Sequence, residues 1–157
     1  MTEADIAPAH ALSEIVHPGY PEDLAIFTER LRLYPAGCFV LDNEREIAGY
    51  ALSHPFVKDR APALNSLLHA LPESCDTYYI HDIALAACAR NTGAGAAIVE
   101  SLRAQARAGG FDAICLVAVN NSAAFWQRQG FVTQDAASLR DKLASYGAGS
   151  VYMRGPA

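Results

Sequence analysis

The chain has 157 residues, of which 52% are hydrophobic and 18% are charged, and its formal net charge is −5. This composition excludes a disordered chain and predicts a single globular domain over residues 1–157. The acidic balance argues against non-specific nucleic-acid binding, and the sequence shows neither a signal peptide nor an apolar run of membrane-spanning length. We therefore expect no nucleic-acid partner, no membrane association and a cytoplasmic location.

The first half of the chain is expected to form two helices, a hairpin and a long connection. The acidic pair Glu22–Asp23 suits the first turn of the second helix, and His54–Pro55 is expected to end the second strand. The connection is long enough to be a substrate-side loop. The predicted elements, in chain order, are helices at 4–15 and 22–33, strands at 38–41 and 47–53, and a short helical centre at 63–70.

The second half alternates strands with helices, which indicates a sheet with helices on its faces. Residues 113–119 form an almost unbroken apolar run, typical of a strand covered on both faces. The predicted elements are strands at 78–85, 113–119, 131–133 and 150–153, with helices at 94–108 and 122–129.

A glycine-rich turn, Arg90-Asn91-Thr92-Gly93-Ala94-Gly95, joins a predicted strand to a predicted helix. The first N–H groups of a helix lack intrahelical partners, and the helix dipole favours negative charge there. Glycines let a ligand approach the backbone closely. The turn therefore predicts a phosphate-binding site.

This turn and the residues around it resemble the GNAT superfamily of N-acetyltransferases. Arg90, Gly93 and Gly95 fill the acetyl-CoA motif [R/Q]-x-x-G-x-[G/A], and Leu85 is the usual upstream hydrophobic residue. Downstream, residues 119–131 match the family pattern of a strand ending in Val-Asn, a short helix with an aromatic residue, and Gly-Phe. The resemblance is clear over 78–131 and weaker over 20–53.

The resemblance implies an α+β fold with α/β/α layers, in which helices flank a mixed, mostly antiparallel sheet of about six strands. It also implies an N-acetyltransferase that moves the acetyl group of acetyl-CoA to a small-molecule or peptide amine in a ternary complex. The pyrophosphate would lie on the turn, and the pantetheine arm would run along the central strand as an added strand. The expected acetyl-CoA contacts are Ile83, Ala84, Leu85, Arg90, Asn91, Thr92, Gly93, Ala94, Gly95, Ala96, Asn120 and Trp126.

The resemblance also implies catalytic groups on the central strand. The N–H of Leu85 is the candidate that polarises the thioester carbonyl. A base must deprotonate the acceptor ammonium, and His81 and Asp82 are both candidates. Strand alternation would place them on opposite faces, whereas a bulge would change this, so both remain open. Tyr20, His54 and His81 are the expected acceptor contacts.

The chain departs from the family pattern at three points. Trp126 replaces the tyrosine that often protonates the leaving thiolate, and indole cannot do so, which leaves Tyr79, Tyr152 or unassisted departure. Asn91 replaces a glycine, although asparagine tolerates a left-handed backbone. The family's usual first strand has no counterpart, so the exposed sheet edge could pair with another chain in a homodimer.

Other readings of the sequence are weaker. Trp126 favours a non-catalytic acyl-CoA-binding or sensor module, whereas His81 and Asp82 argue against it. A dinucleotide-binding domain lacks the third motif glycine, where Ile98 stands, and no P-loop is present. The four cysteines form no C-x-x-C pair and have no histidine at metal spacing, so we expect no metal. Of these cysteines, Cys38 and Cys115 lie in apolar runs and are expected to be buried.

Overall fold

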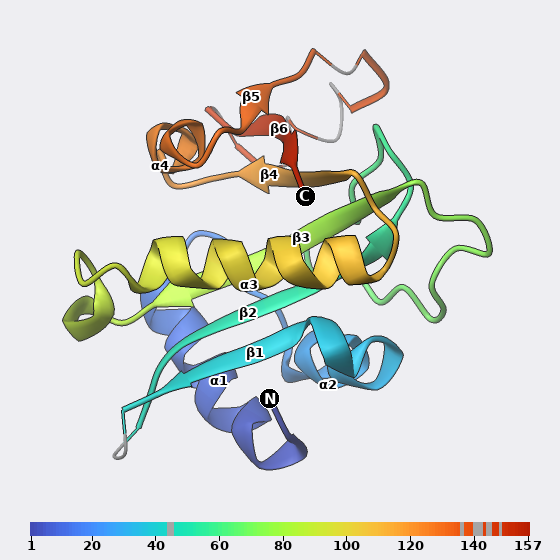
Figure 1. The fold of residues 1–157 in the computed structure, drawn as a ribbon. Coiled ribbons are helices and arrows are strands. Elements are labelled where there is room, and N and C mark those ends of the chain that lie inside the picture. The colour runs from blue at the N-terminus through green and yellow to red at the C-terminus, as the bar shows by residue number, and fades with distance from the viewer. Residues whose placement is uncertain (44–45, 136, 140–142, 144–145, 148) are drawn as a thin grey trace.

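The computed structural model describes residues 1–43, 46–135, 137–139, 143, 146–147 and 149–157. Within these residues, the α-helices α1–α4, six strands and four short 3-10 helices are defined, and Figure 1 shows how they are arranged. The helices are α1 (Ile6–Val16), α2 (Leu24–Leu33), α3 (Ala94–Ala108) and α4 (Ala123–Arg128). The strands are β1 (Cys38–Asp42), β2 (Ile47–Phe56), β3 (Thr77–Leu85), β4 (Ala113–Ala118), β5 (Val132–Thr133) and β6 (Val151–Pro156).

The six strands form one sheet in the order β1-β2-β3-β4-β6-β5. Only β3 and β4 run parallel, and every other neighbouring pair is antiparallel. The predicted mixed, mostly antiparallel sheet of six strands is therefore confirmed. Residues 44–45 of the predicted hairpin loop lie outside the described residues. β1 is an edge strand, and its pairing with another chain stays a prediction.

Helices cover both faces of the sheet, as the sequence predicts (Figure 1). On one face, Val99 and Leu102 of α3 and Trp126 of α4 pack against β3, β4 and β6. On the other face, α1 and α2 pack against β1 and β2 through a second core that includes Leu12 and Phe27. Both predicted buried cysteines, Cys38 and Cys115, lie in the interior.

In the first half of the chain, the largest differences from the prediction concern the end of β2 and residues 63–70. β2 continues through His54 and Pro55 to Phe56. Beyond Leu52, β2 pairs only with β3, so Pro55 needs no N–H on its open side. The predicted helical centre at 63–70 is wrong, because this segment forms turns in which Asn65 and His69 adopt φ of +52° and +63°.

The connection between β2 and β3 is held by a buried ion pair on α2. Arg30 is 1% exposed and Glu29 is 6% exposed. The Glu29 carboxylate accepts hydrogen bonds from the backbone N–H of Leu68 and His69 at 2.7 and 2.8 Å, and it pairs with the Arg30 guanidinium. Arg30 in turn donates to the carbonyl of Ser66. Two adjacent α2 residues therefore fix a long connection that has no regular structure of its own.

Replacing Glu29 with alanine is expected to lower the free energy of unfolding by about 3 kcal/mol, because Arg30 would remain buried without its counter-ion. Urea denaturation would measure the change. Arg32→Ala is the matched control, since Arg32 lies 4.0 Å from the same carboxylate but is 65% exposed, and it should cost less than about 1 kcal/mol. Equal losses in the two variants would contradict the role given to the buried pair.

Candidate active site

A cleft of about 470 Å³ opens where β3 and β4 separate. The two strands pair only from Tyr78 to Ile80 on β3 and from Ile114 to Leu116 on β4. Beyond these residues the strands diverge (Figure 1), and residues from both line the cleft. The end of α1, the loop between α1 and α2, the start of α3 and residues of α4 complete its walls. The site therefore lies at the one parallel junction of the sheet.

Backbone groups of β3 face this opening. The N–H of Ala86 donates to the carbonyl of Ala48 on the β2 side. Hydrogen-bonded and non-hydrogen-bonded pairs alternate along an antiparallel ladder, so the peptide groups of Leu85 and Ile83 point away from β2. The carbonyl of Leu85 accepts from Arg90 Nε at 3.0 Å, and the carbonyl of Ile83 accepts from His17. The two β3 residues therefore present a polar edge to the cleft.

The predicted anion site lies beside the cleft at the start of α3. Gly93 is the N-cap, with φ of +93°, and no side chain caps the helix there. Asn91 has φ of +61°, which confirms that asparagine accepts the backbone expected of glycine. Arg90 and Gly95 line the cleft. The N–H of Ala94 contacts the Thr92 hydroxyl at 3.4 Å, and the amides of Gly95 and Ala96 are the first-turn donors that a ligand at the cleft mouth can reach.

A bulge decides how the two candidate bases lie. Leu52 of β2 pairs with Asp82 and Ser53 pairs with Ile80, so His81 is an extra residue in β3. As a result, His81 and Asp82 both line the cleft instead of facing opposite sides of the sheet. The sequence leaves this point open, since nothing in it fixes a bulge.

His81 is paired with Glu22, which lies two residues before α2 and not, as the sequence predicts, in its first turn. The ring Nε2–H donates to Glu22 Oε2 at 2.9 Å, and both side chains are less than 10% exposed. Burial raises the pKa of Glu22, but the charge and N–H of His81 lower it more, so the net pKa is below its ordinary value. In the neutral tautomer that donates Nε2–H to Glu22, the lone pair of His81 lies on Nδ1.

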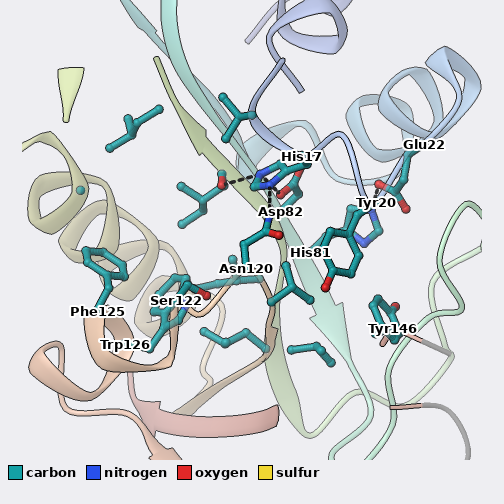
Figure 2. Close-up of a pocket in the computed structure, with 18 of the residues that line it drawn as sticks. His17, Tyr20, Glu22, His81, Asp82, Asn120, Ser122, Phe125, Trp126 and Tyr146 are labelled. Atoms are coloured by element: carbon teal, nitrogen blue, oxygen red, sulfur yellow. Dashed lines mark hydrogen bonds and ion pairs between the residues drawn. The ribbon is translucent and has the colours of Figure 1, made fainter. Parts of the chain in front are cut away.

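Asp82 belongs to a second network, with His17 at the end of α1 and Tyr50 on β2. The hydroxyl of Tyr50 donates to the Asp82 carboxylate, and Nε2 of His17 lies 3.2 Å from Asp82 Oδ1 as an ion pair. Burial raises the pKa of Asp82, but these donors and the His17 charge lower it below its ordinary value. Figure 2 shows His17 between Asp82 and Asn120, with Glu22 beside His81.

Three other predicted contacts also line the cleft. Asn120, which follows β4, donates from Nδ2 to Nδ1 of His17 at 3.1 Å. Trp126 contributes both to the cleft wall and to the core, where its ring packs against Phe125 and Phe131. Tyr20 lies in the wall on the His81 side.

Two predicted contacts, His54 and Ala84, lie in the protein interior instead of the cleft wall. His54 is 1% exposed and is absent from the cleft wall; its ring packs against Phe56 and Tyr79 behind His81. Burial, and then the charge of His81, lower the pKa of His54 to about 3, so this ring stays neutral. Ala84 is also buried and packs into the core on the α1 and α2 face, while its peptide groups pair with β2. The structure thus corrects their placement, because each belongs to the protein interior.

The flanking residues of the turn, Asn91, Thr92, Gly93, Ala94 and Ala96, lie at the helix start next to the cleft rather than in its wall. Within the described ranges, no group of three or more His, Cys, Asp or Glu side chains is arranged to hold a metal ion. No helix in that part of the chain is long and apolar enough to cross a membrane.

Comparison with known families identifies this architecture. The model of the acetyltransferase (GNAT) family matches residues 7–131. The chain belongs to the GNAT acetyltransferase family. No curated protein sequence matches significantly. The family resemblance seen in the sequence is therefore confirmed, and the fold can be compared with those of GNAT relatives.

Solved GNAT structures share the fold at low sequence identity. The GphF GNAT-like decarboxylase in complex with isobutyryl-CoA has a TM-score of 0.80 at 16% identity, covering 99% of this chain and 96% of that one. Ard1 from Thermoplasma volcanium has a TM-score of 0.74 at 14% identity, with 99% and 93% covered. The ribosomal-protein-S18-alanine N-acetyltransferase from Escherichia coli has a TM-score of 0.65 at 16% identity, covering 99% of this chain and 90% of that one.

Sequence reasoning missed His17 and Tyr50 in this GNAT site and expected Glu22 at the start of the second helix. His17 is separated from Ile83 by 66 residues and from Asn120 by 103. No local sequence motif indicates that residues so far apart in the chain are in contact. The available signal was the position of His17 and Glu22 at the break between two predicted helices, where a loop can carry site residues.

Proposed function

We propose that the chain is an N-acetyltransferase that moves an acetyl group from acetyl-CoA to the amine of a small molecule or peptide. The observation that carries this proposal is the shared cleft. It brings together the polar edge of β3, the uncapped start of α3 and the His81–Glu22 pair. The acceptor would attack directly while both substrates are bound, since the three features surround one space.

The residues present fit acetyl-CoA, which would supply an activated acetyl thioester. Gly93, Ala94, Gly95 and Ala96 at the start of α3 would hold the pyrophosphate through backbone amides, with Arg90 adding positive charge at the mouth. A Cβ built on Gly95 would lie 3.1 Å from the Phe125 ring, so a larger residue here would push against a side chain of the cleft wall. Asn91 and Thr92 shape the turn, because the Thr92 hydroxyl donates to the carbonyl of Ala89.

The polar edge of β3 would hold the pantetheine arm in the manner of an added strand, as peptide groups of Ile83 and Leu85 face the opening. The N–H of Leu85 would donate to the thioester oxygen as negative charge develops there. The amide of Asn120 would contact the arm from the opposite side. These assignments use backbone groups that the fold already holds in place.

His81 would take the proton of the acceptor amine. Its Nδ1 carries the lone pair, and the Glu22 carboxylate stabilises the positive charge that the ring acquires. Asp82 is a poorer base, because its oxygens accept from Tyr50 and His17 and its pKa is lowered. Tyr20 would contact the acceptor near His81.

A decarboxylase is the second candidate, because Trp126 offers no acidic proton to a leaving thiolate and decarboxylation releases none. The GphF decarboxylase shares the fold. Against this reading, Glu22 and Asp82 place two carboxylates in the described cleft wall, which would repel the carboxylate of such a substrate. The acidic wall instead suits an amine.

Calorimetric titration with acetyl-CoA would test the proposal first, with ATP and NADH as controls. We expect selective binding of acetyl-CoA with a Kd on the order of micromolar, about −8 kcal/mol. A panel of amines and N-terminal peptides would then be screened for acetylated product, and a 2-carboxyacyl-CoA for loss of carbon dioxide. Folded protein that fails to bind acetyl-CoA would overturn the proposal.

A further inference from the structure

The structure leaves the thiolate without a proton donor among the tyrosines considered from the sequence. Trp126 has no acidic proton. Tyr152 is 0% exposed, and its hydroxyl accepts from the N–H of Asp59, away from the cleft wall. Tyr79 reaches the cleft, but it is 2% exposed and burial raises its pKa well above the ordinary value, which makes it a weak acid. If the thiolate is protonated in the site, a group other than Trp126, Tyr152 and Tyr79 must donate the proton.

His17 spans the opening between β3 and the end of β4. Its Nε2–H donates to the carbonyl of Ile83 at 3.2 Å, and its Nδ1 accepts from Asn120 Nδ2 at 3.1 Å. These two partners are the groups proposed to hold the pantetheine arm from its two sides. An arm that enters between them must therefore run against the imidazole of His17 (Figure 2).

The surroundings of His17 favour its protonated form. Burial lowers the pKa of His17, but the hydrogen bond and charge of Asp82 raise it more, and the carbonyl of Ile83 adds to the increase. Tyr50 on β2 fixes the Asp82 carboxylate from behind. Arg90, before α3, opposes the increase. Among the other titratable groups of the cleft wall, Glu22 and His81 are paired with each other, and the hydroxyl of Tyr146 donates to the carbonyl of Pro62. Tyr20 and Tyr79 complete this set.

We propose that His17 is a second catalytic residue, which protonates the sulfur of CoA as the acetyl group departs; this rests on the acetyltransferase function proposed above. The amine nitrogen forms the C–N bond, the C–S bond breaks with its electron pair on sulfur, and a ring N–H of His17 becomes the S–H of free CoA. The amine proton passes to His81. Both rings then exchange with water, so His17 regains one proton and His81 loses one.

Asn120 can serve both protonation states of His17. Rotation of its side-chain amide exchanges the NH₂ donor for the carbonyl acceptor. The NH₂ group can donate to an unprotonated Nδ1, and the carbonyl can accept from a protonated Nδ1. Asp82 and Tyr50 act as positioning residues, since they hold Nε2 and leave Nδ1 directed to the β4 side. His17 thus forms the acid half of the site, and His81 forms the base half.

Histidine NMR of the wild-type protein tests this without relying on turnover. The His17 ring would be titrated in complex with CoA and with desulfo-CoA, in which hydrogen replaces the thiol. A thiolate beside the imidazolium should raise the His17 midpoint by about 1 pH unit or more in the CoA complex relative to the desulfo-CoA complex. His17→Gln would assign the resonance, and His69→Asn, at an exposed position, is the matched control.

Equal His17 midpoints in two saturated complexes would overturn the role of His17 while leaving the acetyltransferase proposal intact. Absence of binding by either ligand would overturn both. A kinetic comparison separates chemistry from structure: His17→Gln should slow transfer from acetyl-CoA by about 10²-fold but transfer from its selenium analogue by much less, because a selenolate leaves without protonation. Equal slowing with both donors would contradict the proposal.

Discussion

Replacing His81 with alanine is expected to slow acetyl transfer by at least about 10²-fold, the loss typical of a missing general base. The affinity for acetyl-CoA should stay unchanged, because the arm contacts are backbone groups of Ile83 and Leu85 and the pyrophosphate lies at α3. Single-turnover acetylation of an amine identified by the screen would measure the rate, and calorimetry would measure binding. A loss of affinity equal to the loss of rate would contradict the role of His81.

Two further variants make this test specific. Glu22→Gln keeps the shape of the His81 partner but removes its charge, so the ring should become a weaker base and the rate should fall by about tenfold. His69→Asn should transfer at the wild-type rate, since His69 is exposed and adopts a left-handed backbone that asparagine tolerates. If Asp82→Asn were slowed while His81→Ala was not, the base would be Asp82.

The lowered pKa of Asp82 predicts how the rate of acetyl transfer would respond to pH if Asp82 were the base. Its pKa is lowered, so the carboxylate stays ionised as pH falls from neutrality to about 4, the ordinary value. A loss of activity over that interval would therefore not arise from protonation of Asp82. This separates the two candidate bases that the sequence alone left equivalent.

Local pattern was sufficient to predict most of the fold. The helical spacing that ends at Gly109–Gly110 predicts α3 with its observed bounds, and the apolar run at 113–119 predicts β4 to within one residue. The segment at 63–70 failed because its composition favours a helix while tertiary contacts decide its shape. Glu29 and Arg30 hold its backbone groups, and no local signal shows that they do.

The site was only partly predictable for the same reason. The turn before α3 is continuous in sequence, so its glycines could be recognised. The bulge at His81 depends on pairing with β2, and the partners of Asp82 come from α1 and β2. Such contacts exist only after folding. His54 shows the converse, because a histidine near the active strand can be an interior residue.

Gly93→Val is expected to weaken acetyl-CoA binding by at least about tenfold. An added Cβ would meet nothing within 4 Å, so the cause is not crowding. It is the φ of +93°, which a β-branched residue adopts only at a cost of about 1–3 kcal/mol. The turn should relieve this strain by moving the first amides of α3, and those amides form the proposed pyrophosphate site.

Gly110→Val is the matched control for this substitution. Gly110 also has positive φ, +79°, and open space around its Cβ position, but it lies past the opposite end of α3. Both variants should lose similar thermal stability, whereas only Gly93→Val should lose affinity in calorimetric titration. Equal affinity in the two variants would mean that the start of α3 does not bind the phosphates. Loss of affinity in both variants would mean that strain at either end of α3 disrupts the cleft. That result would contradict the specific role given to Gly93.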